Sequence, residues 1–359
     1  MSALPDFPWD LLEPAGRLAA EHPGGLVDLS MGTPVDPVPD PVRAALAAAA
    51  DAPGYPRVAG TPQLREAIAG WLERTTGAGT DGLGVLPTIG SKELIASLPA
   101  VLGLGAGDVV VVPTVCYPTY EVGALLAGAT VVRADDPAQV PATVPVRLVW
   151  VNSPSNPTGA VRPAAELSAW ADWVRDRGAV LASDECYLSL GWEATPVSVL
   201  AVCGAGGHRV LAVHSLSKRS NLAGYRAGFV AGDPEIVARV REIRRHAGLI
   251  VPTPVQAAMV AALGDESPVV AQRERYAARR HRLREALARA GYTVEHSQAG
   301  LYLWVTRGRD CWEDVDWFAR RGILVAPGTF YGPAGARHVR VALTASDERV
   351  AAAADRLVG

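Results

Sequence analysis

The first two-thirds of the chain alternate short apolar runs with longer helical patterns, and this alternation restricts the possible folds more than any other feature. Amphipathic stretches such as PAAELSAWADWVRDR (163–177) lie between several of the runs. The runs are bounded by turn residues and read DVVVVP (108–113), RLVWVN (147–152), GAVLASD (178–184), RVLAVHS (209–215) and AGFVAGD (227–233). Continuous apolar strands separated by helices predict a mostly parallel sheet that helices cover on both faces.

The pattern changes at about residue 268. From there the sequence predicts a long arginine-rich helix (268–292), two short strands (300–305 and 338–344) and a last helix (346–358). We therefore predict three parts. They are an N-terminal arm (1–30) that packs with the small domain, a large α/β domain (31–265) and a small C-terminal α+β domain (266–359).

Composition narrows the classes of protein that are possible. The 359 residues are 49% hydrophobic and carry a net charge of −3, so the chain can bury a core but offers no basic surface for nucleic acid. We expect no membrane span, because prolines interrupt the longest uncharged stretch (247–264), and no leader, because acids and prolines come early. The cysteines lack metal-ligand spacing, which predicts reduced thiols, no metal site and a cytoplasmic location; they are Cys116, Cys186, Cys203 and Cys311.

Lys218, in HSLSKRSNLAGYRAG (214–228), differs from nearly every other basic residue. Of 34 lysines and arginines only Lys92 and Lys218 are lysines. A lysine amine can lose its proton and attack a carbonyl carbon, which a guanidinium cannot do near neutral pH. Lys218 is therefore a candidate nucleophile. The SxxK of penicillin-binding enzymes is excluded, because no KTG element accompanies it.

Polar residues also follow the predicted strands, at the edge where open α/β sheets bind ligands. Asp184 in LASDECY is either a turn or helix-cap aspartate, or a carboxylate that faces the nitrogen of a pyridine ring. Tyr187 and the amide of Asn156, in NSPSNPTG (152–159), could then reach a hydroxyl of the same ring, although NPTG alone is an ordinary turn. Taken together with Lys218, the set is hard to explain by turns.

An anion site is also predicted. TIGSKELIASL (88–98) is a Gly-Ser turn that opens a helix, which is either a plain cap or a cradle of backbone N–H groups. Ser215, Ser217 and Arg226 lie close to Lys218 in the sequence and suit a phosphate. Tyr117 could stack on an aromatic ring or be a half-buried surface tyrosine. GAGTDG (77–82) resembles a dinucleotide loop, but it follows a helical pattern instead of a strand, so we predict an ordinary loop.

These motifs, in this order, resemble the class I/II aminotransferases, which are pyridoxal-phosphate enzymes of fold type I. The resemblance runs from LSMGTPVDPVP (29–39) to HVRVALT (338–344). It implies an α/β fold, the PLP-dependent transferase fold type I, with a mostly parallel seven-stranded-type sheet between helices and a smaller α+β domain. It also implies pyridoxal 5'-phosphate as the cofactor, amino acids and 2-oxo acids as substrates, and a homodimer with shared active sites.

The resemblance also implies roles for individual residues. Lys218 binds the cofactor aldehyde and moves the substrate proton; Asp184 pairs with the ring nitrogen, Asn156 and Tyr187 with the ring oxygen, and Tyr117 with the ring face. Ser91, Lys92, Ser215, Ser217 and Arg226 surround the phosphate, and Tyr55 reaches the phosphate of the neighbouring subunit. Arg340 binds the substrate α-carboxylate, with Gly32 and Asn156 also at the substrate. We expect the pKa of Lys218 to be lowered by the cationic cofactor and by Arg226.

Longer stretches, such as SDECYLSLGWE and HAGLIVPTPVQAAMVAALGD, resemble the actinobacterial-type N-succinyldiaminopimelate aminotransferases of lysine and cell-wall precursor biosynthesis. That family uses glutamate as the amino donor and 2-oxoglutarate as its keto partner. A remote carboxylate on the acceptor calls for a further cation, for which Lys92, Arg57 and Arg219 are candidates unless each is a surface charge. Aminotransferases for aspartate, aromatic amino acids or kynurenine, a carbon–sulfur lyase and a cofactor-binding regulator stay open.

Overall fold

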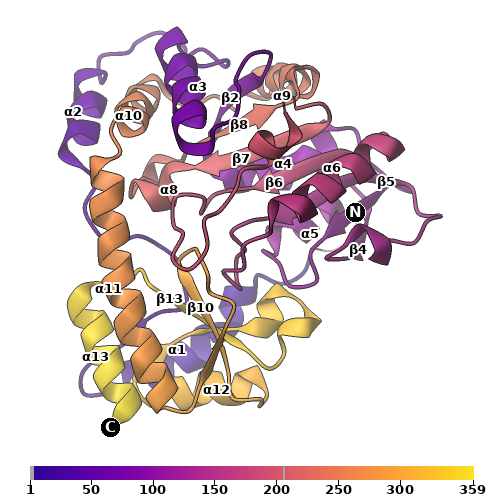
Figure 1. The fold of residues 1–359 in the computed structure, drawn as a ribbon. Helices are drawn as coiled ribbons and strands as arrows, with labels where there is room; N and C mark the ends of the chain where they lie inside the picture. The colour runs from indigo at the N-terminus through magenta and orange to yellow at the C-terminus, as the bar shows by residue number, and fades with distance from the viewer. Residues whose placement is uncertain (1–3, 205–206) are drawn as a thin grey trace.

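The computed structural model describes residues 4–204 and 207–359, and its largest element is a seven-stranded sheet (Figure 1). In spatial order its strands are β2 (Gly84–Ile89), β8 (Ala227–Gly232), β7 (Val210–Ser215), β6 (Val180–Asp184), β5 (Val146–Asn152), β3 (Val109–Val112) and β4 (Thr130–Arg133). β8 runs antiparallel to both of its neighbours, and the remaining pairs are parallel. The predicted mostly parallel sheet is confirmed.

The inner strands are mainly apolar because helices cover both faces. Alternate residues of β3 belong to different hydrophobic cores: Val109 and Val111 face one, Val110 and Val112 the other. The first core includes residues of α3 (Pro62–Thr76), α6 (Ala164–Arg177) and α10 (Thr253–Gly264). The second includes residues of α4 (Gly90–Val101), α5 (Thr119–Leu126) and α9 (Pro234–Ala247). This burial on both faces is what the unbroken apolar runs predict.

The two edge strands were not predicted from the sequence. β2 contains Pro87, which lacks an N–H for pairing and is tolerated because β2 lies at the edge of the sheet. β4, at the other edge, has four residues, none of them buried. GAGTDG (77–82) joins α3 to β2 as a loop and a turn, as expected.

The C-terminal part is α+β, as predicted. Its four-stranded antiparallel sheet has the order β12 (Ala326–Pro327), β13 (Val339–Ala342), β10 (Tyr302–Thr306), β9 (Thr293–Glu295). The helices α11 (Ser267–Arg289), α12 (Cys311–Ala319) and α13 (Asp347–Val358) belong to the same part, and α11 runs alongside both parts of the molecule in Figure 1.

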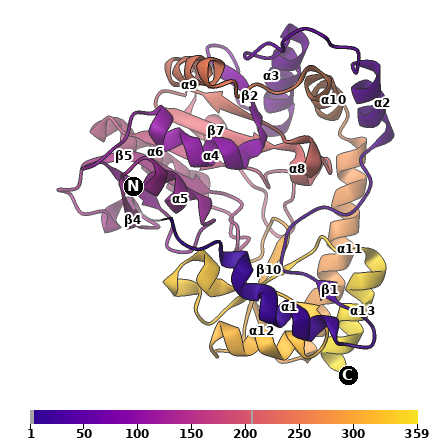
Figure 2. The same ribbon diagram turned by 180° about the vertical axis from the view of Figure 1, so that it is seen from behind.

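The N-terminal segment packs with this C-terminal part. η1 (Pro8–Leu12) and α1 (Glu13–Ala20) lead to β1 (Val27–Asp28), which pairs in parallel with β11 (Ile323–Leu324). Figure 2 shows α1 beside α12, while the residues before η1 extend towards the large sheet. The division at residues 30 and 265 stays a prediction, and residues 1–3 of the predicted arm lie outside the described residues.

Short elements complete the fold. They are α2 (Asp40–Ala48), α7 (Val199–Cys203), α8 (Leu216–Arg219) and the 3₁₀ helices η2 (Pro137–Gln139), η3 (Ala223–Tyr225), η4 (Gly328–Tyr331) and η5 (Pro333–Gly335). In the part of the chain that the structure describes, none of the helices has the length and apolar character that crossing a membrane requires.

Candidate active site

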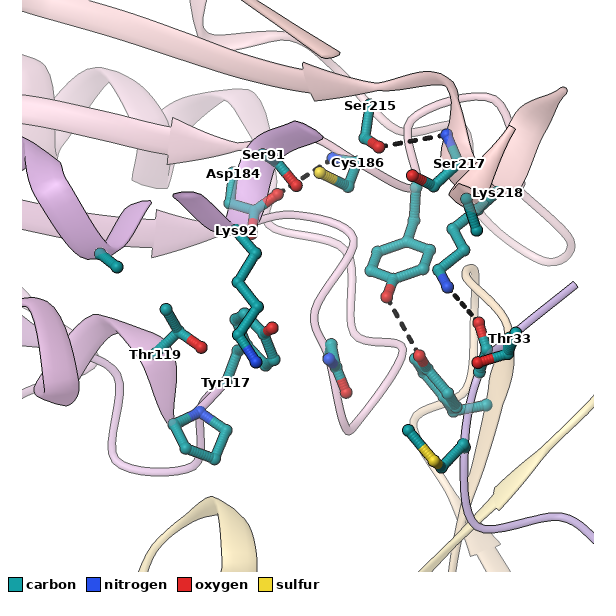
Figure 3. A pocket seen from close by; sticks show the side chains of 18 of the residues that line it. Thr33, Ser91, Lys92, Tyr117, Thr119, Asp184, Cys186, Ser215, Ser217 and Lys218 are labelled. Carbon is teal, nitrogen blue, oxygen red and sulfur yellow. Dashed lines mark hydrogen bonds between the residues drawn. The ribbon is translucent and has the colours of Figure 1, made fainter. Parts of the chain in front are cut away.

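A cavity of about 530 Å³ opens at the carboxyl ends of β5, β6 and β7 (Figure 3). The parallel register places Asn152 beside Asp184, and Asp184 beside Val213, so residues that follow these strands meet at one edge. Most of the residues predicted to bind cofactor or substrate line the cavity: Gly32, Ser91, Lys92, Tyr117, Asn156, Asp184, Tyr187, Ser215, Ser217, Lys218, Arg226 and Arg340.

Lys218 enters the cavity from the short helix α8, directly after β7. The hydroxyl of Ser215 accepts a hydrogen bond from the backbone N–H of Ser217 at 3.1 Å and so starts the helix at this point. The Lys218 amine donates to the carbonyl of Gly32. Burial lowers the pKa of Lys218, and the positive charges of Arg340 and Arg226 lower it further. The expected direction is therefore confirmed, but burial is the largest cause.

Asp184 ends β6 with its carboxylate directed into the cavity. Tyr120 donates to Oδ2 at 2.7 Å, and the backbone N–H of Cys186 donates to Oδ1 at 3.2 Å. Burial nevertheless raises the pKa of Asp184. A cationic N–H placed against this carboxylate would favour its charged form. Sequence reasoning missed Tyr120, which lies in the first turn of α5; its ring packs edge to face on that of Tyr117, with centroids 5.8 Å apart.

Arg340 lies on β13, and its side chain is buried against polar partners. Its guanidinium donates to the amide oxygen of Asn156 at 2.8 Å and to the carbonyl of Ser30. It also lies over the rings of Tyr302 and Tyr331, at 4.0 and 4.9 Å from the ring centroids. Within the described residues no carboxylate forms an ion pair with it. The site thus holds a buried cation that can accept a carboxylate ligand.

An anion cradle forms where α4 begins. Gly90 adopts φ of +70°, and a Cβ atom there would lie 2.4 Å from Nη2 of Arg226, so glycine lets the guanidinium pack over the helix start. Ser91 follows in the first turn of α4, where backbone N–H groups are free of helix partners. Ser215 and Ser217, at the end of β7 and in α8, add hydroxyl groups to the same cavity (Figure 3).

Lys92 and the N-terminal segment form the outer part of the cavity. The Lys92 amine lies 5.7 Å from the ring centroid of Phe7, and Phe7, Pro8 and Trp9 line the same space. Burial and the charge of Arg226 lower the pKa of Lys92. Figure 3 shows Lys92 and Lys218 on different sides of the space. No local pattern indicated Phe7 or Trp9 here, because only the tertiary fold brings residues 7–9 to α4.

Three candidate residues do not line the cavity. Tyr55 is fully exposed, and neither it nor Arg57 lines the cavity of its own chain. The suggestion that Arg219 reads a remote carboxylate is wrong. Arg219 is buried away from the cavity, where it pairs with Glu266 and lies 5.3 Å from the ring centroid of Trp71.

The donor set fits pyridoxal phosphate. That molecule needs a primary amine for its aldehyde, an acid for its ring nitrogen and an anion site for its phosphate. Lys218, Asp184 and the cradle at α4 offer these groups around one cavity. Among the described residues no cluster of histidine, cysteine and acidic side chains could hold a metal ion.

Comparisons with known proteins show what the whole chain is similar to. Residues 25–357 match the family model described as aminotransferase class I and II. The 4-dedimethylamino-4-oxo-anhydrotetracycline transaminase OxyQ of Streptomyces rimosus is 58% identical over 99% of this chain and 100% of its own. A Mycobacterium tuberculosis protein described as a probable aminotransferase is 59% identical over 99% of this chain and 86% of its own.

A solved structure described as a probable N-succinyldiaminopimelate aminotransferase from Thermus thermophilus is 31% identical, with a TM-score of 0.88 over 98% of this chain and 99% of that one. Family match, relatives and fold agree over nearly the whole chain. The chain therefore belongs to the class I and II aminotransferase family, and it is a pyridoxal-phosphate-dependent enzyme.

Proposed function

We propose that the protein is an N-succinyl-LL-2,6-diaminopimelate:2-oxoglutarate aminotransferase, which exchanges the amino group of one compound for the oxo group of the other. The observation that carries this proposal is the pair of cavity cations Arg340 and Lys92, neither of which forms an ion pair within the described residues. An acceptor with one carboxylate at the reacting carbon and another far from it would pair with both.

At the cofactor side, we propose that Lys218 bonds the aldehyde of pyridoxal phosphate and carries the proton of the substrate α-carbon. Its lowered pKa favours the neutral amine that both tasks need. The cofactor, when bound, supplies an electron-accepting ring that stabilises charge at that carbon. Asp184 holds the ring nitrogen, Asn156 and Tyr187 the ring oxygen, and Tyr117 the ring face.

The phosphate is assigned to the cradle at α4. Ser91, Ser215 and Ser217 offer hydroxyl groups there, and Arg226 offers a guanidinium next to Gly90. On the substrate side Arg340 holds the α-carboxylate. Gly32 leaves room for the hydroxyl of Tyr302, which a side chain at position 32 would meet. Lys92 stands nearer the outer part of the cavity, where a remote carboxylate would lie.

We also propose a cytoplasmic homodimer in which Tyr55 reaches the phosphate in the neighbouring subunit. Its side chain is fully exposed and does not line the cavity of its own chain, so it is free to contact a second chain. Mixing the Tyr55→Phe and Lys218→Ala proteins tests this sharing, because only hybrid dimers would then contain one intact site. Absence of any regained activity would contradict a shared site.

The decisive assay supplies the purified holoenzyme with N-succinyl-LL-diaminopimelate and 2-oxoglutarate and measures glutamate. Parallel reactions use aspartate, phenylalanine or kynurenine as the amino donor. We expect the succinylated compound to give the highest kcat/KM, since it alone uses both cavity cations fully. A higher value for another donor would overturn the substrate assignment, and pyruvate with ammonia in the absence of an oxo acid would indicate a lyase.

A second candidate substrate class is a polycyclic aromatic ketone of the kind named for the Streptomyces rimosus relative. It is favoured by the aromatic and apolar outer wall of the cavity, which Phe7, Trp9, Ala96 and Val122 form. An aromatic acceptor could stack on this wall without a remote carboxylate. Turnover of such a ketone with glutamate, above that of the succinylated acceptor, would favour this candidate.

A further inference from the structure

Tyr302 lines the cavity at the point where the two parts of the molecule meet. It is the first residue of β10, in the small sheet, whereas Tyr187 follows β6 of the large sheet. Tyr302 is 4% exposed, so its hydroxyl must find partners inside the protein. The roles proposed above for cofactor and substrate binding do not include it.

The hydroxyl of Tyr302 lies 3.1 Å from the hydroxyl of Tyr187. The rings meet edge to face, with centroids 5.7 Å apart and an angle of 72° between planes. Each phenol has one proton, so one of the two must donate to the other. If Tyr302 donates, the proton of Tyr187 stays available for a ligand oxygen; if Tyr187 donates, it does not.

Two further contacts restrict where Tyr302 can lie. The guanidinium of Arg340, on the neighbouring strand β13, packs over the ring of Tyr302 at 4.0 Å from the ring centroid. The Tyr302 hydroxyl packs on Gly32, since a Cβ atom at 32 would lie 2.1 Å from it. The carbonyl of Gly32 in turn accepts from Lys218. Tyr302 thus touches the groups proposed for the ring oxygen, the α-carboxylate and the substrate side.

We propose that Tyr302 is a positioning residue that donates its hydroxyl proton to Tyr187, so that Tyr187 donates to the cofactor ring oxygen while the Tyr302 ring supports Arg340. This inference rests on the proposed role of Tyr187. Hydrogen bonds in such a chain strengthen one another, because each donor becomes more polarised when its own oxygen accepts. Negative charge on the ring oxygen is stabilised as a result, and a proton on the bound cofactor is released at lower pH.

The visible spectrum of the holoenzyme reports that proton, because absorbance changes with pH around a midpoint. Tyr302→Phe keeps the ring and removes the hydroxyl. We expect it to raise the midpoint by about half a pH unit, as loss of one hydrogen bond in a chain implies. It should lower kcat while the KM for glutamate moves less than about twofold. Tyr302→Leu also removes the support for Arg340 and should raise that KM about tenfold.

Tyr187→Phe serves as the control variant, because it removes the hydroxyl to which Tyr302 is proposed to donate. In that variant we expect a larger rise of the midpoint, and Tyr302→Phe added to it should cause no further rise. A Tyr302→Phe midpoint equal to that of the unmodified enzyme would overturn the proposal, as would the same shift in both backgrounds. The titration uses no substrate, so its result does not depend on which oxo acid is the acceptor. Absence of the cofactor absorbance band from the unmodified enzyme would instead count against the assigned cofactor site as a whole.

Discussion

Four arginines are buried in the part of the chain that the structure describes, and they fall into two kinds. Arg219, Arg244 and Arg279 lie outside the cavity, and each forms an ion pair with a carboxylate. Arg340 lies in the cavity and is equally buried, but its partners are an amide oxygen, a backbone carbonyl and aromatic rings. The two kinds differ in charge compensation and not in burial.

The best-compensated case joins three segments of the chain. Arg279 of α11 donates to both carboxylate oxygens of Asp36, at 2.8 and 2.7 Å, and to Asp347 at 2.6 Å. Gln272 also donates to Asp36 and accepts from Asn221, three residues after Lys218. These bonds fix the loop that carries Gly32 and Ser30 against α11. A buried charge with such partners is a structural element.

Arg340 lacks this compensation, and a buried cation without an anion costs stability. Lys218, which is half-buried, also lacks an ion pair within the described residues, and so do Lys92 and Arg226, which are exposed and therefore cost less. Positive charge without an ion pair therefore collects around the cavity. We infer that this charge is completed by the phosphate and carboxylates of ligands, and that the ligand-free protein bears the cost.

Lys218→Ala should have the largest effect of any change in this cavity. It removes the amine that bonds the cofactor and moves the proton, so we expect turnover to fall by about 10⁴-fold or more and the visible absorbance band to disappear. After borohydride reduction, mass spectrometry should find the cofactor on the peptide that contains Lys218. Cofactor on any other peptide, or normal turnover by the variant, would contradict the assignment.

Arg340→Gln tests the uncompensated charge directly. Without the guanidinium, kcat/KM for glutamate should fall by about 10²- to 10³-fold, because a buried carboxylate would lose its charged partner. In the cofactor-free protein the same change should leave Tm unchanged or raise it by a few degrees, because a buried unpaired cation is removed.

The matched control for that variant is Arg279→Gln. It leaves the carboxylate of Asp36 buried without its main partner, so Tm should fall in the cofactor-free protein. Opposite signs of the two Tm changes would support the distinction between the two kinds of buried arginine. A similar loss of stability in both variants would mean that Arg340 is as structural as Arg279.

The sequence predicted the residues at strand ends better than those that only the tertiary fold brings in. Asp184 and Lys218 follow apolar runs directly, so their place at one edge of the sheet could be inferred. Tyr302 and Phe7 come from segments whose approach to the cavity leaves no local signal. Arg219 was a candidate for the remote carboxylate, with a surface charge as the alternative, and it is neither. It is buried outside the cavity although it adjoins Lys218, because successive residues of a helix point about 100° apart.

Glu266→Gln tests whether Arg219, like Arg279, stabilises the fold through its ion pair and does not bind substrate. The carboxylate of Glu266 is partly exposed, so its loss should cost less than a fully buried pair, about 1–2 kcal/mol in the free energy of unfolding. Chemical denaturation measures this loss, and Glu274→Gln, on the exposed side of α11, is the control. Kinetic constants should stay within about twofold. A rise in KM confined to long dicarboxylic acceptors would restore the substrate role that the structure denies to Arg219.

Lys92→Gln should have the smallest effect. It distinguishes two possible roles of Lys92, binding a remote substrate carboxylate and binding the cofactor phosphate. Lys92 is adjacent to the phosphate cradle but also faces Phe7 at the outer part of the cavity. If it pairs with a remote carboxylate, its loss should raise the KM of such an acceptor about threefold to fivefold, the value of one exposed charge pair. An acceptor without a remote carboxylate, such as 2-oxobutyrate, should be affected less than twofold.

The two acceptors separate these roles because both react at the same cofactor and only one of them carries a remote carboxylate. Lys92→Arg should retain most of the affinity for the charged acceptor, and added salt should weaken that affinity in the unmodified enzyme more than in Lys92→Gln. Exposed Arg43, paired with Asp40, provides a surface control through Arg43→Gln. Equal losses for both acceptors, together with weaker cofactor binding, would place Lys92 at the phosphate instead. The cavity would then lack a cationic side chain to bind the remote carboxylate, and the aromatic ketone would become the better-supported acceptor.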